Sequence, residues 1–289
     1  SRMIFGEMRL ILGVALMAIA PSTFGQSDAR IAGKWYLTWG YNRSIYTRSD
    51  VHIQGEGPSG PFDLTFAAAK AGDMPEQFQP KVYFHPGLFT IPQFDVRVGR
   101  RLTNGWTLGI GWDHMKYKLS DQTLSATGHA AAGDLAEAGY GPAVGLDDQV
   151  DMVLTEAGLP WVEGFNFEHS DGVNFVRVSM EREHTLFSRG PRSSAIKAFG
   201  MGSAGLVVCS TDFTWAGERT KNAQHVSGFG VSLLSGLRFH ATRNLFVQAT
   251  TQAGLLALPW IRIQGPGDAS ADQNFGYAEF AFALGYRWG

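Results

Sequence analysis

Apolar residues alternate with polar or small residues along much of the chain. In the last sixteen residues, 274–289, large apolar side chains fall on one parity and small or charged side chains fall on the other. This period of two predicts a β-strand with two chemically different faces. The apolar set is Phe280, Phe282, Leu284, Tyr286 and Trp288, and the opposite set contains Glu279 and Arg287. A soluble sandwich would bury the large side chains against a second sheet, whereas a membrane barrel turns them toward lipid.

The same alternation recurs in earlier segments, so eight antiparallel strands are predicted in total. The earlier segments are residues 33–46, 91–102, 106–118, 173–186, 193–209, 226–241 and 245–258, and the facing of 193–209 cannot be assigned. Short connections (103–105, 187–192 and 242–244) alternate with long ones (47–90, 119–172, 210–225 and 259–273). Short turns at one end and long loops at the other are typical of outer-membrane barrels. Residues 60–68 and 259–263 also have strand character, which indicates either hairpin extensions above the membrane or a ten-stranded barrel.

Charged residues occupy the strand positions that lie opposite the bulky apolar face. The predicted set is Asp95, Arg97, Asp113, Arg177, Glu181, Glu279 and Arg287. A lipocalin-like soluble barrel, the main alternative, would place ligand-binding apolar residues at these inward positions. An eight-stranded barrel is just wide enough inside for its side chains, and buried charges must be paired. We therefore predict an all-β, antiparallel up-and-down transmembrane barrel of eight strands whose lumen is closed by these charges; a proton or ion path would need a continuous wet channel.

Composition excludes several classes of protein. The chain has 289 residues and a formal net charge of −2, which argues against a general nucleic-acid binder. Charged residues make up 17% of the chain, below the roughly 25% typical of soluble domains. Cys209 is the single cysteine, so neither an intrachain disulfide nor a cysteine metal cluster can form.

The first residues have the pattern of a secretory signal peptide. Arg9 precedes the apolar run 10–20, and small residues follow around Ser22 to Gly25. We predict a signal peptide over 1–27, cleaved between Gly25 and Ala29, followed by a barrel domain over 28–289. The apolar run is too short to cross a bilayer as a helix, and no other run approaches about 18 residues. A membrane-embedded mature chain must therefore cross as a barrel.

The long connection 119–172 is acidic. It holds ten carboxylates and neither lysine nor arginine. A solvated loop explains this composition, and divalent cation binding, for example of Ca²⁺, at Asp147, Asp148 and Asp151 is the alternative, because hard cations take clustered carboxylates. The spacing does not match an EF-hand.

The strand rhythm, the loop asymmetry and the ending Tyr286-Arg287-Trp288 resemble the small eight-stranded barrels of the bacterial outer membrane. The resemblance covers the whole mature chain and identifies a superfamily, not an activity. It implies export across the inner membrane and recognition of the final strand by the barrel-assembly machinery. It also implies surroundings of outer-membrane lipid and lipopolysaccharide.

His169 and Ser170 stand where the acidic connection enters a strand, and Glu183 follows fourteen residues later. The outer-membrane lipid A deacylases are also eight-stranded barrels, and they carry a His-x-Ser-Asn element with a downstream glutamate. That resemblance implies that His169 is a general base and that Glu183 orients it. The sequence departs from the motif, because Ser170 is adjacent to His169 and neighbours on a strand point to opposite faces. Asp171 would share the face of His169 unless a bulge intervenes.

These observations favour a non-enzymatic structural, adhesive or surface-interaction barrel that acts through residues 47–90 and 119–172. No cofactor is expected, and the sequence does not identify the extracellular partner. The alternatives are hydrolysis of a lipid ester at the outer leaflet and conduction through a narrow pore.

Overall fold

The computed structural model describes residues 33–77, 79–83, 85, 88, 91–103, 105–120, 122–138, 149–153, 164–188, 195–263 and 269–289. The predicted signal peptide over 1–27 and its cleavage site lie outside these residues, so both stay predictions. Strands make up most of the described part of the chain. None of the helices there is long and apolar enough to cross a membrane.

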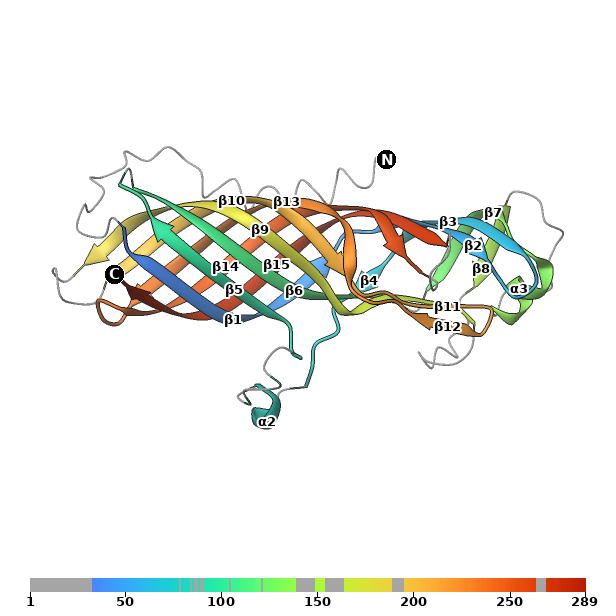
Figure 1. Ribbon diagram of the computed structural model, residues 1–289, viewed down its shortest axis with the longest axis horizontal. Coiled ribbons are helices and arrows are strands. Elements are labelled where there is room, and N and C mark those ends of the chain that lie inside the picture. Colours follow the sequence, from blue (N-terminus) through green and yellow to red (C-terminus); the bar gives the residue numbers. More distant parts are fainter. Residues whose placement is uncertain are drawn as a thin grey trace.

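Eight antiparallel strands form a closed ring (Figure 1). In ring order they are β1 (Trp35–Tyr46), β5 (Phe94–Arg101), β6 (Trp106–Leu119), β9 (Asn166–Ser188), β10 (Ala195–Cys209), β13 (His225–His240), β14 (Leu245–Arg262) and β15 (Ser270–Trp288). The ring closes because β15 pairs with β1 from Trp35↔Trp288 to Tyr46↔Tyr277. The predicted all-β antiparallel barrel is therefore confirmed, with eight strands in the ring and not ten.

The outer wall of the ring is apolar. Outward side chains such as Ile110, Val178 and Phe282 are 63%, 56% and 63% exposed. Trp35, Trp106 and Trp288 all lie at the end of the barrel that carries the short turns, where Trp35 pairs with Trp288. An apolar surface this extensive is rare on a monomeric protein in water, whereas a lipid bilayer solvates it without cost. The exterior is therefore that of a membrane-spanning barrel.

The interior changes its chemistry along the barrel axis. Inward positions of β6 are first small or charged and then apolar, in the order Thr107, Gly109, Gly111, Asp113, Met115, Tyr117 and Leu119. This apolar end belongs to a large hydrophobic core that extends beyond the ring and also contains Val173, Phe275 and Tyr277 of the ring strands. The ionic part of the lumen therefore extends from the short turns to the middle of the barrel.

The sheet continues past the ring into further strands at one end of the barrel, which we call the extension (Figure 1). Residues 270–273, at the start of β15, pair with β2 (Ser49–Glu56). The strands β3 (Pro61–Ala69), β7 (Thr123–His129) and β8 (Gln149–Val153) then follow in order. Its other elements are β4 (Ala71–Gly72), which pairs with β6, the hairpin of β11 (Asp212–Trp215) and β12 (Glu218–Lys221), and the helix α3 (Ala132–Glu137). The helix α2 (Pro80–Tyr83) stands apart from it in the same figure.

The extension corrects the expectation that 47–90, 119–172 and 210–225 are loops. Each range contains strands, because apolar side chains there have partners on distant segments. Residues 61–69 form β3, and 259–262 lengthen β14, so these two ranges are extensions and not additional ring strands. Aromatic rings from two of the ranges pack against each other in the core, for example Phe62 and Trp215, whose ring centroids lie 5.1 Å apart with the ring planes tilted by 41°.

His52 ties three strands of the extension together at their surface. Its Nδ1 lies 2.7 Å from Asp272 Oδ2 on β15, and its Nε2 lies 2.9 Å from Asp63 Oδ1 on β3. Burial alone would lower the pKa of His52, but the hydrogen bonds to Asp272 and Asp63 outweigh burial and raise the pKa above its ordinary value.

The His52 contact should therefore stabilise the extension in a pH-dependent way. Because the pKa is raised on folding, the stabilisation is complete below the unfolded value of about 6.5 and is lost as the pH rises through the folded value. We predict that His52→Gln lowers amide-exchange protection of β2 relative to wild type at pH 6, and that this difference vanishes at pH 9. An equal difference at both pH values would contradict the charged contact.

Candidate functional site

The middle of the lumen holds a cluster of ionic side chains, which we call the central cluster. Asp95 and Arg97 come from β5, Asp113 from β6, Arg177 from β9 and Glu279 from β15. The register brings them together, because Asp95 pairs with Asp113 and Gly111 lies between Arg97 and Arg177. A Cβ atom on residue 111 would lie only 3.1 Å from Arg177 Nε, so glycine leaves the space that the guanidinium fills.

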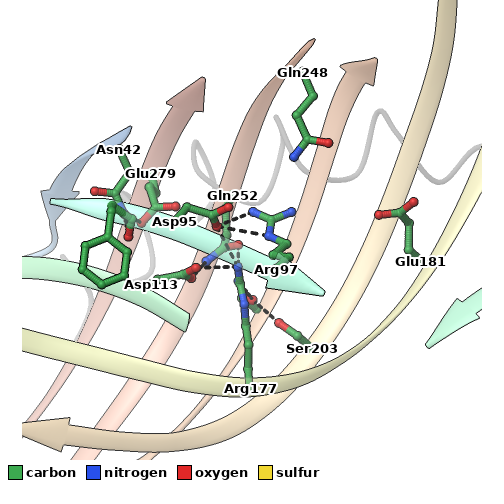
Figure 2. Close-up of polar contacts among 12 residues, drawn as sticks. Asn42, Asp95, Arg97, Asp113, Arg177, Glu181, Ser203, Gln248, Gln252 and Glu279 are labelled. Carbon is green, nitrogen blue, oxygen red and sulfur yellow. Dashed lines mark hydrogen bonds and ion pairs between the residues drawn. The ribbon is translucent and has the colours of Figure 1, made fainter. Parts of the chain in front are cut away.

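Arg177 is the centre of the hydrogen bonding in this cluster (Figure 2). Its Nη2 donates to Asp113 Oδ1 at 2.6 Å and to Asp95 Oδ2 at 3.1 Å. Arg97 Nη2 donates to the same Asp95 oxygen at 2.6 Å. Gln252 accepts from Arg177 and donates to Asp113 Oδ2 at 2.9 Å. The pairs lie in a water-poor interior, where each charge depends on its partner.

Glu279 joins the cluster with a weaker partner. Asn42 Nδ2 donates to Glu279 Oε2 at 2.9 Å, and Figure 2 shows both side chains beside Asp95. Oxygen atoms of Asp95, Asp113 and Glu279 lie within 4.8 Å of one another, the one such group of potential metal ligands among the described residues. Three carboxylates are the donor set that hard cations prefer. Arg97 and Arg177 already occupy Asp95 and Asp113, so the geometry favours an ion-paired plug over a metal centre.

A second cluster, the end cluster, fills the lumen nearer the short turns. Glu183 lies 2.8 Å from Arg101, 2.7 Å from Lys197 and 3.0 Å from Arg238, and 3.6 Å from Arg287. Arg238 also donates to Glu181 at 3.0 Å. Its guanidinium carbon lies 5.1, 4.3 and 4.8 Å from the ring centroids of Tyr36, Phe199 and Phe246, which are cation–π distances. Ion pairs and aromatic rings together fill this end of the barrel.

All seven charges predicted for the lumen point inward. Six of them are between 0% and 4% exposed, namely Asp95, Arg97, Asp113, Arg177, Glu181 and Glu279. Arg287 lies at the rim of the end cluster, where its side chain is 11% exposed. The prediction missed Arg238, Glu183, Lys197 and Arg101 as members. Arg238 could have been found, because it alternates with the outward Leu237 and Phe239 and must therefore face inward. Lys197 lies on the strand whose facing could not be assigned from sequence.

The structure does not bring His169, Ser170 and Glu183 together. Both His169 and Glu183 are on β9, but His169 lies near the extension and Glu183 lies in the end cluster. The fourteen residues between these positions correspond to about 46 Å along a strand. His169 Nδ1 contacts Thr211 Oγ1 at 3.1 Å. Burial, and next the nearby His225, lower the pKa of His169 to about 3, which makes its imidazole a poor proton acceptor at neutral pH. A general base oriented by Glu183 is therefore not formed.

An irregularity in β9 changes the faces of the residues that follow His169. Met115 pairs with Val173 and Tyr117 with His169, so residues 170–172 stand opposite a single residue of β6. Gly172 at the bulge has a φ of +119°, which favours glycine. Asp171 is consequently exposed and pairs with Lys221, whereas His169 is buried. The expectation that these two side chains share a face is corrected by the bulge.

The cation site predicted in the acidic connection lies mostly outside the described residues. Asp147 and Asp148 lie outside the described residues, and for Asp151 the backbone alone is described, in β8. Two other acids of this connection serve structural roles. Asp134 accepts a hydrogen bond from the Ser59 amide at 2.9 Å, and buried Glu168 lies 3.6 Å from Lys118 Nζ. Calcium binding at Asp147, Asp148 and Asp151 stays a prediction.

A closed ring of eight antiparallel strands, apolar outside and ionic inside, is the architecture of the small outer-membrane β-barrel proteins. The fold of this chain resembles theirs. No protein-family model matches the sequence. A comparison with curated protein sequences also gave no match.

Several solved structures are similar in strand arrangement at low sequence identity. Neisserial surface protein A is 10% identical, with 88% of this chain and 98% of that chain covered and a TM-score of 0.37. Ail, the attachment invasion locus protein of Yersinia pestis, is 9% identical, with 89% and 99% covered and a TM-score of 0.32. The outer membrane protein OprG of Pseudomonas aeruginosa is 7% identical, with 89% and 96% covered and a TM-score of 0.35.

Removing Arg177 should destabilise the barrel strongly. The substitution Arg177→Met leaves Asp95 and Asp113 buried without their shared partner, which we expect to cost about 3–5 kcal/mol. Adding Asp113→Asn should restore part of this loss, so the double variant costs less than the sum of the two single variants. Free energies of unfolding of the wild type, the two single variants and the double variant are measured in detergent micelles. A loss in the double variant equal to the sum of the two single losses would show that the two side chains are not coupled.

Proposed function

We propose that this chain is a closed outer-membrane barrel that displays an ordered β-structured module above the membrane for contact with extracellular molecules, without catalytic chemistry. The observation that carries the proposal is the length of the ring strands. β15 has 19 residues and β9 has 23. A transmembrane strand needs only about 9–11 residues. Roughly half of each strand is therefore available to build structure outside the lipid.

The packing of the extension supports its role as a rigid platform. Its core is continuous with the apolar upper interior of the ring and includes Phe66, Phe167 and Ile261, none of which is exposed. A platform joined to the barrel by continuous strands holds its surface in a fixed position relative to the membrane. Such preorganisation lowers the entropy that a binding surface loses when a partner docks.

The outer hairpin of the extension has the composition of a water-facing surface. Strand β12 reads Glu218-Arg219-Thr220-Lys221, and Arg219 pairs with Asp212 across the hairpin. Charged side chains on such a peripheral strand discourage uncontrolled pairing with other chains. This arrangement supports exposure of the hairpin to water and not to lipid.

The two alternative functions receive less support from the geometry. A pore needs a continuous wet path, but the central and end clusters fill the lumen with paired side chains. A lipid ester hydrolase needs a base beside a nucleophile and an orienting acid. The distance between His169 and Glu183 leaves that constellation unassembled.

Surface labelling tests the proposed orientation. Glu218 in the β11–β12 hairpin and Arg243 in a short turn are both exposed and lie at opposite ends of the molecule. In intact cells a membrane-impermeant maleimide should label the Glu218→Cys variant. It should label Arg243→Cys only after the outer membrane is permeabilised. The native Cys209 is buried and gives little background. Labelling of Arg243→Cys alone in intact cells would reverse the orientation and refute the proposed display.

Two assays separate the proposal from the alternatives. In a planar lipid bilayer the purified protein should produce no single-channel currents, because ion pairs fill the lumen. Mass spectra of lipid A from cells with and without the protein should show the same acylation. Regular unitary currents would establish a pore, and a lipid A species that loses one acyl chain only in the producing cells would establish an esterase.

A further inference from the structure

The outer wall of the barrel contains a hollow of about 340 Å³ that none of the interactions above explains. It lies across β13, β14 and β15, next to the turn that joins β1 to β2. Phe229, Val231 and Leu255 form its apolar part, and Arg48 and Asn274 stand at its polar part. The hollow therefore combines a greasy wall with a cationic edge.

Small residues at outward positions create the hollow. Phe229 pairs with Ala257 and Leu255 pairs with Gly276, so one methyl group and one hydrogen atom face outward between large neighbours. A Cβ atom on residue 276 would lie 3.0 Å from Thr47 Cγ2, which shows how closely the β1–β2 turn approaches this point. The strand backbone is thereby left as the floor of the hollow.

The hollow straddles the boundary between lipid and water. Phe229, Val231 and Leu255 are 51%, 52% and 50% exposed and belong to the apolar belt. Trp260 packs beside Phe229 with ring centroids 6.4 Å apart, and tryptophan is enriched where the bilayer meets water. Arg48 and Asn274 are exposed, and the neighbouring strand β2 belongs to the extension. A molecule in the hollow would have its apolar part in lipid and its polar part at headgroup level.

Arg48 supplies the charge at this edge. Its Nη1 makes one long hydrogen bond, 3.4 Å to the Ala68 carbonyl. A guanidinium has five N–H donors in a planar fork, a geometry that matches phosphate oxygens. The remaining donors of Arg48 can therefore bind a phosphate that sits at the top of the hollow.

We infer that the hollow is a binding site for one anionic, phosphate-bearing lipid of the outer leaflet. One acyl chain lies along Phe229, Val231 and Leu255, and the headgroup phosphate accepts hydrogen bonds from Arg48. This inference rests on the proposed placement of the barrel in the outer membrane, and it adds a specific lipid site to that placement.

Lipid selectivity in nanodiscs tests the site. The full protein is reconstituted into nanodiscs that contain equal amounts of phosphatidylglycerol and phosphatidylcholine with the same acyl chains. Native mass spectrometry then reports the lipids that stay bound after release. For wild type we expect about fivefold enrichment of the anionic lipid, the factor that one interfacial arginine supplies. Arg48→Gln should abolish the enrichment, whereas Arg243→Gln at the opposite end of the barrel should retain it.

A second pair of variants tests the acyl-chain part of the site. Ala257→Phe fills the hollow and should remove the retained lipid of both types. Ala253→Phe is the matched control. Residue 253 also faces outward on β14, but it lies four residues nearer the short turn, opposite Leu233. Ala257→Leu serves the same purpose should the phenylalanine variant not fold.

The outcomes distinguish this site from the proposed membrane placement. Failure of the wild type to enter nanodiscs would refute the placement and the lipid site together. Entry without enrichment, enrichment that survives Arg48→Gln, or lipid retention that survives Ala257→Phe would refute the lipid site and leave the placement intact.

Discussion

Closure of the sheet between β1 and β15 is the constraint on which the rest of the structure depends. Unpaired backbone N–H and C=O groups in a bilayer cost several kcal/mol each, so a membrane-spanning sheet cannot have an open edge there. The pairing from Trp35↔Trp288 to Tyr46↔Tyr277 removes that edge. Closure with eight strands also makes the interior narrow, so every inward side chain must fit and every inward charge must have a partner. The central and end clusters follow from this restriction.

The inward side chains of the ring strands differ between the two ends of the barrel. Near the short turns the strands are apolar outside and ionic inside, because lipid surrounds them and buried charges pair across the bore. Further along, the inward positions become apolar, for example Met115 and Tyr117 on β6, and they join the core of the extension. In the proposed orientation, this change lies where the barrel leaves the membrane. One continuous hydrogen-bonded sheet joins the ring to the extension.

The ring was predictable from sequence because a long period-two pattern survives in every ring strand except the Gly-rich β10. The parity rule alone placed Asp95, Arg177 and Glu279 inside, since adjacent side chains on a strand must face opposite ways. It could not establish ion-pair partners, because Arg177 meets Asp113 and Asp95 only after three strands assemble.

The extension was not predictable for three physical reasons. Its strands are short, such as the five residues of β8, so a period of two is hard to separate from chance. Its pairings, such as β15 with β2 and β3 with β7, join segments far apart in sequence. The bulge after His169 also changes which face of β9 the following side chains occupy. In the sequence, Gly172 alone indicated such a bulge.

The free energy of unfolding in phospholipid vesicles tests whether the apolar exterior contacts lipid around an ionic lumen. Ile110 faces outward near the middle of the apolar belt and is 63% exposed. We predict that Ile110→Arg lowers this free energy by about 2–4 kcal/mol, the cost of an arginine at the bilayer midplane. A change near zero would place Ile110 in water and contradict a lipid-facing exterior.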